Sequence, residues 1–572
     1  MPREDSGVAA GGQEKVSLSA RARAYIRARS TMNEPNPATP AANKLNTKAA
    51  GIVGLAVMCS RVLGLAREVV FGILFGAGKS MDAFTMAFKT PNLLRDLFAE
   101  GALSTAFITT FSKKIATEGE PAAWRLANKI GTLLLITMIA IAFAGVVLAP
   151  YLLSITVTGF KQDPDKFALT VLLAQIMFPF IILVSLGAQV MGILNSRNVF
   201  GSPAMASSFF NIGSIIGGVA LAWWIDPAFG PRALIGLAIG TLIGGALQLA
   251  VQIPALRKLG YRFRFDFDWR DEGVMQVVRQ MGPAIIAASS VQVNVMVNGW
   301  FASWLEDGTA YRLGVAFRLM QLPLGLFGVA LGTVTLPLIS RMAAQKNMAD
   351  FGAVLARGFR LAFLLTIPST VGLMLLGRPI ISLLYEHGKF SAHATDQAAL
   401  GLQGYALGLC AYSALKILAP AFYAIDRRRT PMMVSFLSIG LNFGLNWFLA
   451  FKLKWGIQGL GFATGCVATF NFALLYWLMR RETAHLETRA LFVTFGKLLI
   501  PTALLAAVCI GARASVLAGW EHFALPVKAV ALLATIALAG AAFFGAATLL
   551  RVEEMTEITA LVKRKLGRRK AA

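Results

Sequence analysis

Five lysine and arginine residues lie inside stretches that are otherwise apolar: Arg61, Arg67, Lys89, Arg95 and Arg318. A cation in the hydrocarbon core of a bilayer is costly, so it persists mainly where it faces a water-filled cavity or a carboxylate. The planar arginine side chain binds phosphate oxygens through two hydrogen bonds and keeps its charge at working pH. The pattern predicts a cationic cavity for an anionic cargo, and it favours a phosphate or pyrophosphate group.

Carboxylates accompany these cations at Glu68, Asp82, Asp96 and Glu100. On an ideal helix, Lys89 and the last three carboxylates fall within about 40° of one another. They form a polar stripe that we expect to face a cavity. Alternatively, the carboxylates only neutralise the cations and pin the helices together. Arg318 has no carboxylate in its own span, which favours a cargo site.

The elements that must position these residues are membrane-spanning helices. Hydrophobic residues make up 56% of the chain. Apolar stretches of about 20 residues recur along it, each long enough to cross a bilayer as a helix. We predict an all-α polytopic membrane protein with about 14 transmembrane helices.

An internal repeat organises these helices. Ala87-Phe88-Lys89 matches Ala316-Phe317-Arg318, 229 residues later, and Ser202-Pro203 resembles Thr430-Pro431 at nearly the same offset. An even number of spans separates the matched units, so the repeat is parallel in the membrane. This predicts two pseudo-repeated six-helix lobes plus two C-terminal helices, and lobes of this kind commonly rock around a central site.

The predicted organisation has six parts. They are a disordered cytoplasmic tail (1–48), an N-lobe of spans one to six (49–257), a cytoplasmic inter-lobe loop (258–281), a C-lobe of spans seven to twelve (282–480), spans thirteen and fourteen (481–550), and a basic cytoplasmic tail (551–572).

The net charge of +25 does not indicate nucleic-acid binding, because of its distribution. Most of the 54 Lys and Arg residues fall in the two tails and in alternate loops, on one side of the predicted membrane. By the positive-inside rule this side is cytoplasmic, and both termini lie there. The basic loop from Arg257 to Arg279 is then a topology determinant that would also attract anionic lipid head groups.

No catalytic or metal-binding motif stands out. The four cysteines lie in predicted spans, without a disulfide framework. Gly78-Lys79-Ser80 resembles the end of a P-loop, but Ile73 stands where the motif requires its first glycine. We therefore expect a transporter rather than an enzyme, with no cofactor and no metal site. Its energy would come from a coupling ion or the membrane potential.

Several motifs resemble one family of transporters. They are SRVLGLAR at 60–67, FGAG at 75–78, AFKTPNLLR at 87–95, FAEGA at 98–102, QMGPA at 280–284 and GVALGT at 328–333. In these segments the chain resembles the MurJ/MviN lipid II flippases. They belong to the multidrug/oligosaccharidyl-lipid/polysaccharide exporter superfamily.

The resemblance implies a fold of fourteen helices in two lobes, with the last two helices forming a groove for a lipid tail. The implied cargo is lipid II, the undecaprenyl-pyrophosphate-linked precursor of peptidoglycan. It would move from the cytoplasmic to the periplasmic leaflet of the bacterial inner membrane. Membrane lipids and the cell-wall synthesis machinery are the implied partners, and we expect a monomer.

The resemblance also assigns residue roles. It places the essential charged residues of the family at Arg61, Arg67, Asp82, Arg95 and Arg318. Our own hypothesis is that Arg61, Arg67, Arg95 and Arg318 bind the pyrophosphate, while Asp82, Glu100, Glu68 and Lys89 act in gating or charge pairing. The family pattern places an acid just before Arg318 and another three residues after it. Here those positions are Phe317 and Gln321, so Arg318 lacks local carboxylate partners.

The hypothesis is alternating access, in which a cavity between the lobes opens first inward and then outward. Flipping of another polyprenyl-pyrophosphate glycan is an alternative, because the pyrophosphate is shared. A cation-coupled drug exporter is a second alternative, although it would be expected to expose unpaired carboxylates. A membrane scaffold of the cell-wall machinery is a third.

Overall fold

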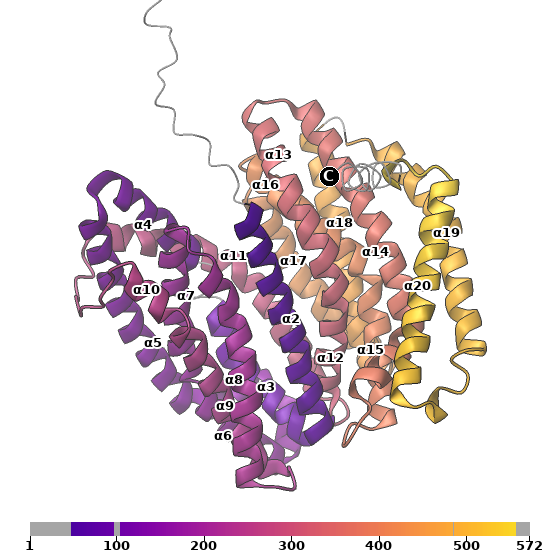
Figure 1. Ribbon diagram of the computed structural model, residues 1–572, viewed down its shortest axis with the longest axis horizontal. Coiled ribbons are helices and arrows are strands. Elements are labelled where there is room, and N and C mark those ends of the chain that lie inside the picture. Colours follow the sequence, from indigo (N-terminus) through magenta and orange to yellow (C-terminus); the bar gives the residue numbers. More distant parts are fainter. Residues whose placement is uncertain (1–46, 97–102, 484–485, 556–572) are drawn as a thin grey trace, which may run out of the picture. The chain divides into compact units, whose positions relative to one another are not determined.

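The computed structural model describes residues 47–96, 103–483 and 486–555, and in these ranges every regular element is a helix (Figure 1). The chain divides into two units, Met1–Gly54 and Leu55–Ala572. Of the first unit only residues 47–54 are described, and they form the start of α2. The second unit holds all the other helices. The predicted tails 1–48 and 551–572 fall almost entirely outside the described residues.

The helices of the first half follow the predicted spans in order. They are α2 (Thr47–Phe75), α3 (Lys79–Arg95), α4 (Ser104–Glu118), α5 (Glu120–Thr156), α6 (Pro164–Met177), α7 (Phe180–Ser196), α8 (Gly201–Ile225), α9 (Leu234–Ala250) and α10 (Ile253–Lys258). Short 3-10 turns, η2 (Thr158–Gln162) and η3 (Pro231–Ala233), precede α6 and α9.

The second half contains a matching series. It consists of α11 (Glu272–Ser303), α12 (Thr309–Pro323), the π-helical turn η4 (Leu324–Val329), α13 (Ala330–Ala344), α14 (Met348–Tyr385), α15 (Ala392–Leu407), α16 (Leu409–Ala424), α17 (Arg429–Asn446), the π-helical turn η5 (Trp447–Lys452) and α18 (Gly456–Glu482). Two further helices follow, α19 (Thr488–Ala514) and α20 (Leu525–Leu549), and the 3-10 turn η6 (Trp520–His522) lies in the connection between them.

The two halves repeat in both sequence position and packing. Helix α14 starts 228 residues after α5, and α15 starts 228 residues after α6. The packing pairs correspond as well: α3 packs on α6 as α12 packs on α15, and α8 packs on α9 as α17 packs on α18. The predicted fold of two pseudo-repeated lobes plus two C-terminal helices is therefore the observed one.

The exact number of spans is not confirmed. In the described residues, ten helical segments are long and apolar enough to cross a membrane, or eleven if α15 and α16, which meet at a bend of 43°, form one span. The stretch that carries Lys89 and Arg95, which we predict as a single span, consists of α3 and α4, and residues 97–102 between them are not described. Helix α11 begins at Glu272, well before the predicted span at 282, because Asp271 caps it by accepting from the backbone of Gly273 and Val274.

The buried cores show how the lobes meet. One large cluster joins both halves, with Phe71, Met81 and Phe160 from the first half packed with Phe301 and Tyr311 from the second. Two other clusters belong mainly to single lobes, one around α4, α5 and α7 and one around α13, α14 and α16. The lobes thus share a core at the end where α2 leads into α3, and keep separate cores at the opposite end.

The last two helices are attached to α14. Leu498, Leu505 and Cys509 of α19 and Phe543 of α20 share a buried cluster with Leu364 of α14. An ion-pair cluster reinforces this contact at one end of α14. The guanidinium of Arg360 on α14 pairs with Glu554 at 2.5 Å and with Glu487 at 2.7 Å.

Candidate functional site

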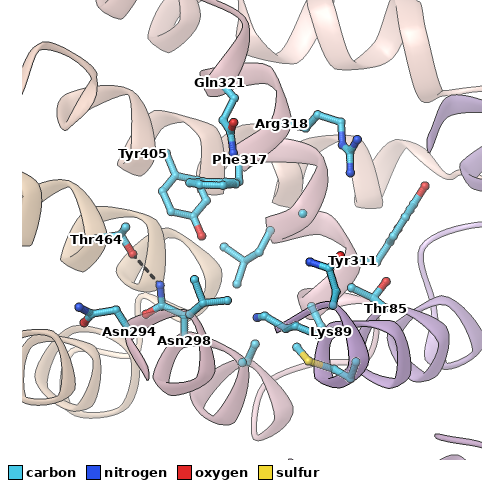
Figure 2. Close-up of a pocket in the computed structure, with 18 of the residues that line it drawn as sticks. Thr85, Lys89, Asn294, Asn298, Tyr311, Phe317, Arg318, Gln321, Tyr405 and Thr464 are labelled. Carbon is cyan, nitrogen blue, oxygen red and sulfur yellow. Dashed lines mark hydrogen bonds between the residues drawn. The ribbon is translucent and has the colours of Figure 1, made fainter. Parts of the chain in front are cut away.

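A cavity of about 530 Å³ lies between the two lobes. Its walls come from α2 and α3 of the first lobe and from α11, α12, α17 and α18 of the second. Figure 2 shows Lys89 and Thr85 from the first lobe and Asn294, Asn298 and Thr464 from the second, arranged around this space. Because the walls belong to different lobes, a relative movement of the lobes would change the shape of the cavity.

One wall of the cavity carries the predicted charges. Arg67, Glu68, Lys89 and Arg318 all line it. The Glu68 carboxylate accepts from Arg318 Nη2 at 2.7 Å and from Arg67 Nη2 at 3.2 Å, through the same oxygen, Oε1. Arg318 therefore has a carboxylate partner from α2, although it has none on its own helix. One carboxylate between two guanidinium groups leaves this wall with a positive balance.

Lys89 adds a third cation to this wall. Among the described residues it makes no hydrogen bond or ion pair, and its ammonium lies against the backbone of Gly299 on α11. Figure 2 shows its ammonium end directed toward the side of the cavity where Asn298 lies. A cation held at a cavity wall without a carboxylate is available to an anionic ligand.

The cations of the two lobes stand at two depths. Measured along the helices from the turn between α2 and α3, Arg67 lies at about 12 Å and Lys89 at about 15 Å, and Arg318 lies about 14 Å from the start of α12. Arg61 and Arg95 lie further along α2 and α3, at about 21 and 24 Å. The first three form one level and the last two a second level, on the side where the lobes have separate cores.

Arg61 and Arg95 do not belong to the lining of the cavity. Arg61 is exposed, and its guanidinium occupies the space that a side chain at Gly325 of η4 would need. Arg95 donates to the neighbouring Asp96, with its Nη2 at 2.9 Å from Oδ1. The predicted gathering of four arginines in one cavity is therefore seen for Arg67 and Arg318, with the other two placed toward the cavity's far end.

The opposite wall is rich in neutral amides. Asn298 accepts at Oδ1 from Asn446 at 2.8 Å and from Asn442 at 3.0 Å, and it donates to Thr464 Oγ1 at 3.1 Å (Figure 2). Asn294 donates to Ser438 Oγ at 3.2 Å. This wall offers hydrogen-bonding groups without net charge, so the two sides of the cavity differ in chemistry.

Asp82 lies outside the cavity, in the closed end of the lobe interface. Its buried carboxylate accepts from the backbone N–H of Gly308 at 2.7 Å and of Tyr311 at 3.0 Å, which are at the start of α12. Lys166 of α6 donates to it at 3.0 Å and also to Asp307 at 2.8 Å. A negative charge at a helix N-terminus is favourable. Asp82 therefore joins the two lobes by capping a helix of the opposite lobe.

Backbone contacts close this end further. Gly308 has φ +90°, and a side chain there would overlap the carbonyl oxygen of Ala77. Lys389 donates its backbone N–H to Ile73 at 2.9 Å and its ammonium to the carbonyl of Ala228 at 2.6 Å. These loops are hydrogen-bonded directly to each other, so this end of the lobe interface is closed.

An acid in the loop before α12 supports the same closure. Glu306 accepts from His393 at 2.9 Å and from Arg312 at 3.2 Å. Partial burial acts to raise the pKa of Glu306, but the hydrogen bonds from Arg312 and His393 outweigh it and leave the pKa below its ordinary value. Glu306 is thus held as the anion at neutral pH.

The predicted polar stripe of α3 is divided between three surroundings. Asp82 is buried in the closed end, Lys89 lines the cavity, and Asp96 pairs with Arg95. Glu100 falls outside the described residues. The prediction that the stripe faces one cavity is therefore wrong for Asp82. Its carboxylate is needed by Lys166 and by the N-terminus of α12, and neither partner is visible from the sequence of α3.

The amide wall was missed from the sequence. A usable signal existed, because Asn294 and Asn298 are four residues apart, as are Asn442 and Asn446, which places each pair on one helix face. Phe317 and Gln321, noted as departures from the family pattern, both line the cavity. In the described part of the chain, no three His, Cys, Asp or Glu side chains group as metal ligands.

Comparison with solved structures defines the class of protein. A structure titled lipid II flippase MurJ, inward closed conformation, superposes with a TM-score of 0.69 at 24% identity, covering 87% of this chain and 99% of that one. An inward-facing multidrug resistance MATE family transporter of the MOP superfamily gives 0.59 at 14% identity, covering 76% and 98%. The chain therefore has the fold that these two transporter structures share.

Sequence comparison defines the family. The family described as lipid II flippase MurJ matches residues 72–530. A Vibrio cholerae protein named probable lipid II flippase MurJ is 32% identical over 511 residues, covering 88% of this chain and 95% of that protein. A lipid II flippase MurJ of Burkholderia cenocepacia is 34% identical over 430 residues, covering 74% and 82%. The chain belongs to the MurJ family of lipid II flippases, which confirms the predicted family and the prediction of a transporter rather than an enzyme.

Proposed function

We propose that this protein flips lipid II from the cytoplasmic to the periplasmic leaflet of the bacterial inner membrane by alternating access. The observation that carries the proposal is the cationic wall of Arg67, Lys89 and Arg318 in a cavity shared by two lobes. The names of the relatives support lipid II as the cargo.

The cations would hold the pyrophosphate. Arg67 and Arg318 are already oriented by Glu68, so little side-chain entropy is lost when an anion binds them. Lys89 supplies a further charge that no carboxylate neutralises among the described residues. Arg61 and Arg95, at the second level, would meet the pyrophosphate first as it enters from the end with separate cores.

The amide wall would receive the uncharged part of the head group. Sugar hydroxyls and peptide amides are both donors and acceptors, and asparagine side chains offer both kinds of group. Asn294 and Asn471 line the cavity, and within the described part of the chain their side-chain oxygens accept no hydrogen bond. With the pyrophosphate on the cationic wall, the glycan and peptide would extend toward these oxygens.

The closed end would be the outer gate. If the basic loops lie in the cytoplasm, the end with separate cores faces the cytoplasm and the seal around Asp82 faces the periplasm. Rocking of the lobes would break this seal and open the cavity outward. The polyprenyl chain would stay in lipid beside α19 and α20, whose exposed residues include Phe492, Leu499 and Leu533.

The energy source would be a coupling ion or the membrane potential. Moving one unit charge through 100 mV changes the free energy by about 2.3 kcal/mol. With Phe317 and Gln321 in place of the acids of the family pattern, α12 offers no carboxylate to a proton beside Arg318. The potential acting on the cationic wall would then reset the empty transporter.

Transport in proteoliposomes tests the proposal. Labelled lipid II in the inner leaflet of vesicles that contain the protein should become accessible to a reagent outside them. Arg318→Ala should reduce the rate of this transfer at least tenfold. Arg378→Ala is the matched control, because Arg378 pairs with Asp396 outside the cavity. Equal rates for the wild type and Arg318→Ala would refute the site.

The competing functions predict other results. A flippase for a different polyprenyl-pyrophosphate glycan would move that glycolipid faster than lipid II in the same vesicles. A drug exporter would move a cationic dye, and a scaffold would move none of these substrates. Accumulation of lipid II on the cytoplasmic face of cells depleted of the protein would support the flippase.

A further inference from the structure

The connection between the two lobes exposes an unusual row of aromatic residues. Between α10 and α11, residues 261–269 read YRFRFDFDW, in which aromatic and charged residues alternate. The side chains of Phe263, Phe265, Phe267 and Trp269 are 50, 66, 55 and 48% exposed. Contiguous exposed apolar surface of this kind marks an interaction site.

The segment is fixed on α5 and does not hang free. Tyr261 packs against Trp124 with ring centroids 5.4 Å apart. The backbone N–H of Arg264 donates to Asn128 at 3.1 Å, and that of Asp266 donates to Thr132 at 3.0 Å.

A partly exposed ion-pair cluster fixes the far end of the segment. The ammonium of Lys129 on α5 lies 2.8 Å from both Asp268 and Asp271. The segment therefore lies along the first turns of α5 and is held there by two backbone hydrogen bonds and by these ion pairs. Its exposed rings are a stable surface.

This surface continues a face of α5 that a bilayer would cover. Beyond Thr132, at a helical spacing of three or four residues, the exposed side chains are Ile136, Ile139, Phe143 and Val147. Helix α5 is one of the segments apolar enough to span a membrane. The aromatic row lies at the end of this face, where the helix would leave the hydrocarbon. Tryptophan is enriched at this depth of membrane proteins, and phenylalanine side chains of interfacial segments enter the boundary between head groups and acyl chains.

The charges of the segment specify the kind of lipid. Arg262, Arg264 and Arg270 are exposed, and Arg257 and Lys258 at the end of α10 are exposed beside them. Two of the four nearby acids, Asp268 and Asp271, are bound to Lys129. The five exposed cations therefore outnumber the other two acids, Asp266 and Glu272. Exposed basic residues next to a bilayer surface attract anionic head groups.

We propose that residues 262–270 form an interfacial anchor: the arginines bind anionic phospholipid head groups and the aromatic rings enter the boundary with the acyl chains. The anchor holds the joint between α10 and α11, and with it the hinge between the lobes, at the membrane surface. This proposal is independent of the cargo of the transporter.

Spin labelling in nanodiscs tests the anchor. The four native cysteines are replaced, and a label is attached through Phe265→Cys or, as the control, through Gln345→Cys, which is exposed in the turn between α13 and α14. Power saturation with oxygen and with a water-soluble nickel complex reports the depth of each label. Nanodiscs of phosphatidylcholine alone are compared with nanodiscs that also contain phosphatidylglycerol.

We expect the label at Phe265→Cys to be accessible to oxygen and protected from nickel. The ratio of its oxygen accessibility to its nickel accessibility should be at least threefold higher than that of the control label. The label should also lie deeper in the anionic nanodiscs. Arg262→Gln with Arg264→Gln should remove the dependence on anionic lipid while the rings stay in place. A label in water in both lipids would overturn the proposal. If the label lay at the same depth with and without anionic lipid, the proposed binding of the arginines to anionic head groups would be overturned. Because all these residues are exposed, the variants should fold, and a monodisperse elution profile checks this.

Discussion

Replacing Asp82 with asparagine should open the sealed end of the lobe interface. The Asp82 side chain is 1% exposed and carries a charge that three donors share. Asparagine has the same shape but no charge, and it has one oxygen where the carboxylate has two. One backbone N–H at the start of α12 would therefore lose its acceptor. The ammonium of Lys166 would lose its ion pair with residue 82 and retain the one with Asp307.

The size of the effect follows from these losses. Removing one partner of a buried ion pair typically costs ~3–5 kcal/mol. Because Lys166 retains a second carboxylate, we expect a somewhat smaller cost, about 2–4 kcal/mol, which destabilises the closed state alone. Since each 1.4 kcal/mol is a factor of ten, the ratio of closed to open molecules should fall by about 30- to 700-fold.

Double electron–electron resonance measures this ratio directly. Labels at Lys161 and Ala392, which are exposed on opposite lobes at the sealed end, should show a short distance in the wild type. Asp82→Asn should add a longer distance or replace the short one. Asp165→Asn, at an exposed carboxylate of the same end, is the control and should leave the distance unchanged. If Asp82→Asn gave the wild-type distribution, Asp82 would not hold the gate.

Three further predictions concern charge. Arg318→Lys should lower lipid II transport about tenfold in the vesicle assay, because a lysine cannot bind two phosphate oxygens in parallel; an unchanged rate would indicate a diffuse electrostatic role. Because the pKa of Glu306 is lowered in the folded state, its stabilisation is present above the ordinary carboxyl pKa and is lost as the pH falls through the lowered value. The fraction of molecules that show the short distance at the sealed end should therefore fall in acid, below pH ~4. Glu306→Gln should remove this pH dependence. Glu554→Gln should lower the melting temperature in detergent, since Glu554 is buried against Arg360, whereas Glu521→Gln, at an exposed site, should not.

The helical framework could be predicted because its signals are local. Span length and the spacing of apolar residues determine each membrane helix, and the repeat of Ala87-Phe88-Lys89 at Ala316-Phe317-Arg318 gave the offset that relates the lobes. The observed helices keep this offset from α5 and α14 onward. Boundaries were less predictable, since capping by Asp271 extends α11 into a loop that is polar in sequence.

The site was predictable only in part, because its charges find partners across lobes. Sequence identified Arg67 and Arg318 as cavity residues, but their shared carboxylate, Glu68, lies some 250 residues from Arg318 in the chain. Asp82 looked like a cavity residue because helical periodicity places it on one face with Lys89. The partner that removes it from the cavity, Lys166, is on another helix. Pairings between distant segments leave no periodic signal in either.

The repeat suggests how cargo binding reaches the gate. Asp82 and Lys89 lie on α3, about 10 Å apart along the helix axis, and their repeat counterparts Tyr311 and Arg318 lie on α12 with the same spacing. At the gate, the Asp82 carboxylate accepts from the Tyr311 backbone, so the ends of the two helices are bonded to each other. In the cavity, the same two helices carry cations that repel one another. An anion between Lys89 and Arg318 would remove this repulsion and draw the helices together at the level of the cavity. Since helices move as rigid units over two turns, that approach would change the angle at which their ends meet. The bonds of Asp82 depend on this angle, and the seal would therefore respond to the charge in the cavity.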